Sequence, residues 1–289
     1  MGSTEERNNL QLAINQLRIS DLLVKGAQRL LAARHYHAIG VGKSPDNLIV
    51  FFHGGYFIDG NLDDADAFLR QLASNNPKHV VLAVTYTLAH AEPFPAAVED
   101  AYAALLWARN NKRKLNWNGR NLLVSGIEAG ANLATVSAMV SRDRCGPKLT
   151  GQVLFMPMLD AELCSESMRG LPASAELAKM SDECATGYRS YLPNPIDRIH
   201  PYACPLRSSR LQHLPSTLII SAKQDPLHDE GEQYAQKLVA CGVATQVWRI
   251  PDTQQPLQVD GRAAWAAVAH NKITDFLNSL TPYSDEVRS

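Results

Sequence analysis

The sequence predicts an α/β fold in which a mostly parallel central sheet carries helices on both faces. Short apolar runs rich in β-branched residues alternate along the chain with longer segments of helical period. Residues 80–84 read Val-Val-Leu-Ala-Val, a run typical of a strand that is buried on both faces. With 289 residues, 45% of them hydrophobic, the chain is long enough for one large core. We therefore expect residues 1–289 to form a single domain.

The alternation defines six strands and five helices. Strands are expected over residues 48–52, 79–85, 121–125, 152–156, 217–221 and 245–250. Helices are expected over residues 63–74, 96–110, 129–141, 230–241 and 262–280. Parallel neighbours need a crossover between them, and these helices supply it.

Two segments do not fit the alternation. Residues 8 to about 35 carry leucines in a loosely helical pattern, and residues 161–215 are interrupted by Pro172, Pro193, Pro195, Pro201 and Pro205. The second segment places ~50 residues between two strands, far more than an ordinary crossover needs. We expect residues 1–40 and 161–215 to form a helical lid over the carboxyl ends of the strands, where open parallel sheets bind ligands. The alternative is that both are peripheral helices filling an edge.

The overall charge limits the classes of partner. The chain has 28 Lys+Arg against 29 Asp+Glu and a formal net charge of -1, which argues against nucleic acid as a partner. Its longest apolar runs are far below the ~18 residues that span a bilayer, so no membrane span is expected. The first residues do not resemble a secretory signal, and the five cysteines are odd in number and widely spaced. Free thiols in a cytoplasmic protein are the expectation, with no cofactor.

Four stretches, in order, carry a resemblance to a known family. They are Phe52-His53-Gly54-Gly55-Tyr56-Phe57, the run from Tyr86 to Asp100 with Pro93-Phe94-Pro95-Ala96-Ala97, Gly126-Ile127-Glu128-Ala129-Gly130-Ala131-Asn132-Leu133-Ala134, and Asp225-Pro226-Leu227-His228-Asp229-Glu230-Gly231. Together they resemble the hormone-sensitive-lipase-like esterases and lipases of the α/β-hydrolase fold. The resemblance spans most of the chain.

The resemblance implies a role for each stretch. The loop with Gly54 and Gly55 matches the family's oxyanion loop, and Ala129 follows the nucleophile position. Glu128 stands at that nucleophile position, on the turn between a strand and a helix. Asp225 matches the acid of the catalytic triad.

The departures from the family pattern concern the catalytic triad itself. The nucleophile position holds Glu128 where the family has Ser, and no histidine occurs between His228 and His270 to serve as the base. Gln255 is the best match to the lost histidine, with Gln254 next. A glutamine can exchange hydrogen bonds as a neutral imidazole does, but an amide does not carry a proton near neutral pH.

A carboxylate at the elbow changes what the site can do. It points to where an oxyanion would form, and it lies at a helix N-terminus, which favours negative charge. We expect Glu128 to occupy or border its own oxyanion hole, facing the amides of Gly54, Gly55 and Ala129.

Two classes of function follow. The first is a catalytically silent homologue that binds a small-molecule ligand or a protein partner; plant gibberellin receptors, similar to these esterases, bind ligand without turnover. The second is an active hydrolase or lyase with a nonstandard site, in which Glu128 attacks as a carboxylate nucleophile. A metal site from Glu128, Asp225 and His228 is conceivable from ligand types, but their spacing does not favour it. The resemblance also suggests a homodimer.

Overall fold

The central sheet has eight strands within the residues that the computed structural model describes, which are 17–39, 44–170, 175–222, 225–250 and 262–280. Its strand order is β1-β2-β4-β3-β5-β6-β7-β8. β2 runs antiparallel to β1 and β4, and the pairings from β4 through β3 to β8 are parallel. The strands are β1 (Leu17–Lys25), β2 (Leu30–Ala38), β3 (Asn47–Phe52), β4 (His79–Val84), β5 (Asn121–Ile127), β6 (Gly151–Phe155), β7 (Ser216–Ala222) and β8 (Thr245–Ile250).

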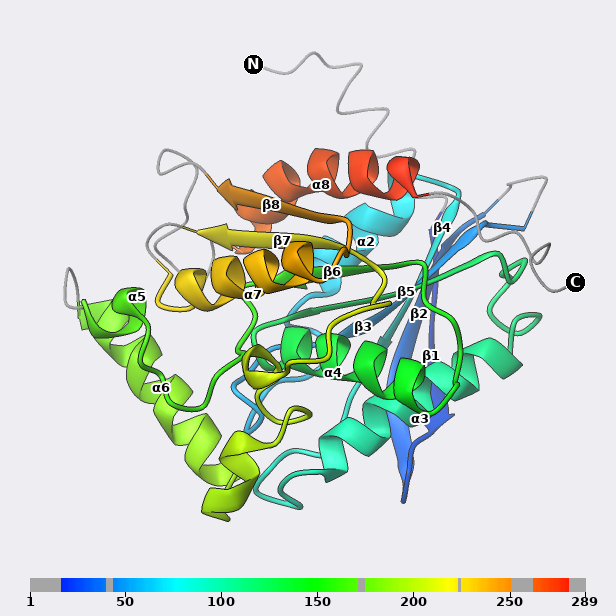
Figure 1. Cartoon of the computed structure of the whole chain (residues 1–289). Helices are drawn as coiled ribbons and strands as arrows, with labels where there is room; N and C mark the ends of the chain where they lie inside the picture. The colour runs from blue at the N-terminus through cyan, green and yellow to red at the C-terminus, as the bar shows by residue number, and fades with distance from the viewer. Residues whose placement is uncertain (1–16, 40–43, 171–174, 223–224, 251–261, 281–289) are drawn as a thin grey trace, which may run out of the picture.

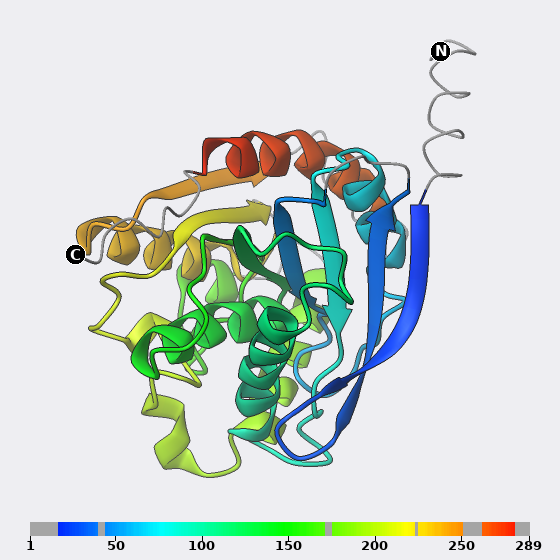
Figure 2. The same ribbon diagram turned by 90° about the vertical axis from the view of Figure 1, so that its right-hand side faces the viewer.

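Helices cover both faces of this sheet, so the molecule has three layers (Figures 1 and 2). α2 (Asp66–Ser74) and α8 (Arg262–Ser279) lie on one face, and α3 (Ala96–Asn110), α4 (Ala129–Asp143) and α7 (His228–Ala240) lie on the other. All six predicted strands and all five predicted helices are confirmed, with ends that differ by at most three residues. Every residue of β3, β4, β5 and β6 is buried, which explains why these strands read as continuous apolar runs.

The helical pattern expected before the first parallel strand was wrong over the described part of that segment. Residues 17–38 form the antiparallel strands β1 and β2 at the edge of the sheet. Leu31 and Ala33 are buried while Leu30 is 62% exposed, so the true period is two. Exposed leucines and buried polar residues on these edge strands obscured that period. These strands belong to the sheet, and residues 1–16 lie outside the described residues.

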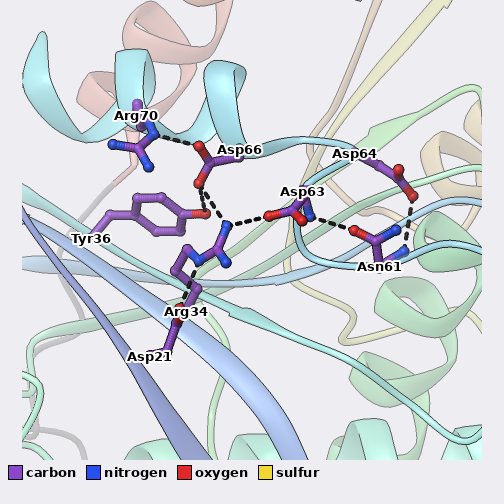
Figure 3. A network of polar contacts seen from close by, with 8 residues as sticks. All are labelled: Asp21, Arg34, Tyr36, Asn61, Asp63, Asp64, Asp66 and Arg70. Carbon is purple, nitrogen blue, oxygen red and sulfur yellow. Dashed lines mark hydrogen bonds and ion pairs between the residues drawn. The ribbon is translucent and has the colours of Figure 1, made fainter.

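An ion-pair network attaches this edge to the start of α2 (Figure 3). The Arg34 guanidinium on β2 lies 2.7 Å from carboxylate oxygens of both Asp21 and Asp63, and 3.0 Å from Asp66. Tyr36 donates a further hydrogen bond of 2.8 Å to Asp66. Exposed ion pairs contribute little stability individually, but one guanidinium that is shared by three carboxylates fixes their positions relative to one another. The network therefore holds the segment after the loop of Gly54 and Gly55 against β2.

The second predicted lid segment forms α5 (Glu166–Arg169), α6 (Ala175–Tyr191) and two short 3-10 helices, η1 (Pro195–Ile199) and η2 (Pro205–Arg207). Figure 1 shows α5 and α6 at the end of the sheet toward which the arrows of β7 and β8 point. Covering of a ligand by this segment stays a prediction.

Two glycines let α4 approach the sheet at the end of β3 and β5. A Cβ at Gly130 would lie 2.2 Å from the Phe52 carbonyl oxygen and 2.3 Å from that of His53. A Cβ at Gly126 would lie 2.2 Å from the Gly130 carbonyl oxygen. These neighbours are backbone atoms and cannot rotate away. The first turn of α4 therefore depends on glycine for its position.

We expect Gly130→Ala to destabilise the protein by about 2 kcal/mol or more, because the new methyl group must displace backbone. Gly231→Ala is the matched control, since Gly231 lies in the first turn of α7 and its Cβ would meet side-chain atoms, those of Ile219 at 3.2 Å and Pro157 at 3.6 Å. The control should stay within about 1 kcal/mol of wild type, helped by the better helix propensity of alanine. Urea unfolding monitored by circular dichroism measures both. Equal stability of the two variants would contradict the close-approach account.

Candidate functional site

Glu128 lies on a strained turn between β5 and α4. Its backbone has φ 52° and ψ -111°, a left-handed conformation that costs a non-glycine residue about 1–3 kcal/mol. The Glu128 amide donates to the Phe155 carbonyl at 2.9 Å, and the Glu128 carbonyl accepts from the amides of Asn132 at 3.0 Å and Met158 at 3.3 Å. Both backbone groups of the strained residue are thus satisfied by its neighbours. This is the strand-turn-helix geometry predicted for the elbow.

The loop that faces the elbow is a tight turn after β3. Gly55 has φ +104°, and its carbonyl accepts hydrogen bonds from the amides of Ile58 at 3.0 Å and Asp59 at 2.9 Å. Tyr86 packs against this loop. Its hydroxyl donates a hydrogen bond of 3.2 Å to the His53 carbonyl, and its ring stacks on the His53 ring with the ring centres 4.4 Å apart. Sequence reasoning did not give Tyr86 this role, although it opens the second matched stretch. The turn aims the Gly55 amide away from its own loop.

The Glu128 carboxylate meets this loop. The Gly55 amide donates a hydrogen bond of 3.2 Å to Glu128 Oε2, and a Cβ at Gly54 would lie 3.0 Å from the same oxygen. Glu128 is only 8% exposed, and Ala129 after it is fully buried. The structure therefore brings together Glu128, Gly54 and Gly55, while the role of these residues and of the Ala129 amide as an oxyanion hole stays a prediction.

Asp225 lies in the turn between β7 and α7 and is also buried. Its Oδ1 accepts a hydrogen bond of 2.8 Å from the Leu227 amide. Burial raises the pKa of Asp225 to about 7; the Leu227 amide opposes the rise and the negative charge of Glu128 adds to it. Glu128 and Asp225 are therefore close enough to influence each other's charge. Gln255 and Gln254 lie outside the described residues, so their placement stays a prediction.

A second buried carboxylate on α7 was not predicted to have a role. Glu230 is 1% exposed, and its Oε2 accepts hydrogen bonds from the amides of Leu159 at 2.7 Å and Asp160 at 3.0 Å. Burial raises its pKa to about 8, although the two amides act in the opposite direction. Glu230 thereby joins the start of α7, beside Asp225, to the loop after β6. Its only signal in the sequence is its place in the fourth matched stretch.

Helix α6 lies directly against the loop after Gly55. A Cβ at Gly187 would lie 2.2 Å from the Tyr56 carbonyl oxygen, and the Phe57 and Tyr191 rings stack at 3.9 Å. Burial and then the Glu128 charge raise the pKa of both the Tyr56 hydroxyl and the Cys184 thiol, which places Cys184 of α6 near the elbow. α6 therefore packs against the loop whose Gly55 amide meets the Glu128 carboxylate.

The described residues contain no group of three His, Cys, Asp or Glu side chains arranged to hold a metal ion. His228, considered above as a ligand, instead faces the Asp225 carbonyl at 2.8 Å and the Asp229 carboxylate at 3.1 Å. Among the same residues, no helix is both long and apolar enough to cross a membrane.

Comparison with known proteins identifies the relatives of this chain. Residues 49–255 match the family described as alpha/beta hydrolase fold. An arylesterase from Saccharolobus solfataricus is 34% identical over 230 residues, which cover 80% of this chain and 74% of the relative. The esterase LipI of Mycobacterium tuberculosis is 32% identical over 238 residues, covering 80% and 72%.

Solved structures give the same result. An esterase from Pyrobaculum calidifontis superposes with a TM-score of 0.73 at 32% identity, covering 93% of this chain and 91% of that one. Carboxyl esterase 2 from Tuber melanosporum superposes with a TM-score of 0.82 at 25% identity, covering 92% and 88%. The chain therefore belongs to the α/β-hydrolase family, in its hormone-sensitive-lipase-like esterase and lipase branch.

Proposed function

We propose that this esterase homologue does not hydrolyse esters by the triad chemistry of its family and that its pocket binds a small ligand instead. The observation that carries the proposal is the Glu128 carboxylate at the nucleophile position, hydrogen-bonded to the Gly55 amide. The fold and its oxyanion loop are kept, while the reacting group is replaced.

Acyl transfer requires that negative charge develop on the substrate oxygen beside backbone N–H donors. The Glu128 carboxylate already takes the hydrogen bond of Gly55 and places a negative charge within a buried site. A second negative charge there would be repelled in surroundings of low dielectric constant. The elbow carboxylate thus removes both the nucleophilic hydroxyl and part of the stabilisation of the transition state.

The proton relay is the second requirement that the chain does not meet. The family's base position aligns with Gln255, and an amide does not take a proton from an attacking group near neutral pH. The buried Asp225 remains, but its pKa near 7 and the neighbouring Glu128 charge favour the protonated acid. A protonated acid orients an imidazolium less well than a carboxylate does. The arrangement supports a polar network in place of a relay.

The class of ligand follows from the charge of the site and from its relatives. The relatives are named as esterases, and the ester group on which an esterase acts carries no charge. An anionic ligand would face the carboxylate of Glu128. We therefore infer a small neutral ligand held beside the aromatic wall of α6, and we favour it over a protein partner.

We expect the wild-type protein to leave p-nitrophenyl acetate and butyrate unhydrolysed above background. Glu128→Ser alone should remain nearly inert, because a hydroxyl needs a base. Glu128→Ser combined with Gln255→His should raise the rate by about 10² to 10⁴ over the single variant, since removal of the Glu128 charge lowers the pKa of Asp225 and lets its carboxylate orient the imidazole. Steady-state kinetics with both esters measure the series.

The control for the loop alignment is Glu128→Ser combined with Gln254→His, which should stay inert. Saturable wild-type turnover that disappears on Glu128→Ala would overturn the proposal and indicate a carboxylate nucleophile. A folded double variant without activity would show that the pocket has lost catalytic register elsewhere.

A further prediction concerns Asp225, whose folded-state pKa of about 7 lies above its ordinary 3.8. Its charged form is disfavoured in the fold, so its contribution to stability is complete below about pH 4 and is lost as the pH rises through about 7. The free energy of unfolding of Asp225→Asn should therefore equal that of wild type near pH 4 and exceed it by roughly 2 to 4 kcal/mol above pH 7. Urea unfolding from pH 4 to 9 measures the difference.

Glu128→Gln provides the companion variant. Removing the Glu128 charge should shift the Asp225 transition to lower pH, because that charge raises the pKa of Asp225. A stability difference for Asp225→Asn that stays constant over the whole pH range would show that Asp225 is not a buried titrating group.

A further inference from the structure

A block of positive charge lies far from the elbow, on the turn that joins α3 to β5. Residues 109–120, here called the basic turn, read Arg-Asn-Asn-Lys-Arg-Lys-Leu-Asn-Trp-Asn-Gly-Arg and contain no acidic residue. The chain as a whole has a formal net charge of -1, so this turn is a strong local departure from its average.

The cations of the basic turn are held in place by aromatic rings and backbone. Lys114 Nζ lies 5.2 Å from the centre of the Trp107 ring, and Lys112 Nζ lies 6.0 Å from that of Trp117. Arg109 donates to the Gly119 carbonyl at 3.4 Å. A lysine held over a ring keeps N–H bonds that can reach a ligand.

Few carboxylates neutralise this charge. Within the ranges that the structure covers, Arg120 pairs with Asp46 at 3.3 Å, and no ion pair joins Arg109, Lys112, Arg113 or Lys114 to a carboxylate. These four positive charges lie on six consecutive residues. Their mutual repulsion favours an external anion.

The positive charges of the basic turn are not needed to cap the end of α3. The Trp107 carbonyl accepts from the Asn111 side-chain amide at 2.8 Å, and the Ala108 carbonyl accepts from the Asn111 backbone amide at 3.2 Å. The carbonyls at the helix end are thus satisfied without the cations. The helix macrodipole amounts to about half a charge at this end, well below four.

The basic turn also borders an open surface hollow of about 600 Å³, lined by residues 109–114. This volume lies in the range of small-molecule sites, about 300–1,000 Å³. The side-chain amides of Asn110 and Asn111 add neutral donors to the four cations. The Asn118 amide donates a hydrogen bond to the Pro45 carbonyl, and the Trp117 ring N–H donates one to the Asp46 carbonyl. These bonds place the turn at the amino ends of β3 and β5, opposite the elbow.

We propose that the hollow of the basic turn binds a compact anion that carries two or more phosphate groups. Closely spaced arginine and lysine donors suit phosphate oxygens, and four cations within six consecutive residues match a compact polyanion better than an extended polymer. This site is separate from Glu128 and the loop that faces it, so the inference does not depend on the function proposed above.

Isothermal titration calorimetry with inorganic triphosphate at low salt tests the inference. Wild type should bind saturably, and raising the salt from about 50 to 200 mM should weaken binding several-fold. Lys112→Gln combined with Lys114→Gln should raise Kd at least tenfold. Lys25→Gln combined with Arg169→Gln, which removes the same charge from exposed residues elsewhere, should leave Kd within about twofold.

A fluorescence measurement places the bound anion. Triphosphate should change the tryptophan emission of wild type, and Trp107→Phe should remove part of that change, because Lys114 lies over this ring. The proposal would be overturned by absence of binding at millimolar triphosphate, or by equal weakening in the two charge-removal variants. Binding of acidic peptides without binding of triphosphate would also contradict it.

Discussion

The strained backbone of Glu128 is the constraint on which the rest of the site depends. Its positive φ turns the chain sharply from β5 into α4 and directs the side chain toward the loop of Gly54 and Gly55. The turn is possible because Gly126 and Gly130 allow backbone to approach backbone where any side chain would collide. A strained backbone conformation of this kind persists only where contacts with its surroundings hold it in place. Here the hydrogen bonds to Phe155, Asn132 and Met158 do so.

The same scaffold can therefore carry different chemistry. The parallel sheet is that of the α/β-hydrolase family, to which the chain belongs, and the sequence resemblance predicts that the loop after β3 and the buried acid after β7 match the family's site. What a strained elbow does depends on the side chain that it presents, and fold alone does not determine function. A carboxylate in this position accepts the hydrogen bond of the Gly55 amide, which we propose a substrate oxygen would otherwise need. The proposed loss of ester hydrolysis thus follows from two changes in one retained fold, the charge at the elbow and the missing base.

The parallel sheet and the elbow could be predicted from the sequence because their residues carry local signals. Fully buried strands read as apolar runs, and the elbow glycines stand at fixed spacings around Glu128. β1 and β2 could not be predicted, since edge strands expose Leu23 and Leu30 and bury His35, which disturbs any simple period. Their pairing depends on β4, which is distant in sequence.

Two further features needed tertiary information. Glu230 looks like an ordinary polar residue of an amphipathic helix, and only the fold brings it to the amides of Leu159 and Asp160. The basic turn was missed for a different reason. A balanced total charge suggests a neutral surface, whereas charge acts locally, over about 10 Å at moderate salt.

The most direct test of the central claim is the ¹H–¹⁵N NMR signal of the Gly55 amide, compared between wild type and Glu128→Ala. A hydrogen bond to a carboxylate should shift the Gly55 proton downfield in wild type, and the shift should be lost in the variant. The Gly60 amide, which donates to the Asp59 carboxylate at 2.8 Å, provides a control that should not move. A Gly55 signal that is the same in both proteins would contradict the account.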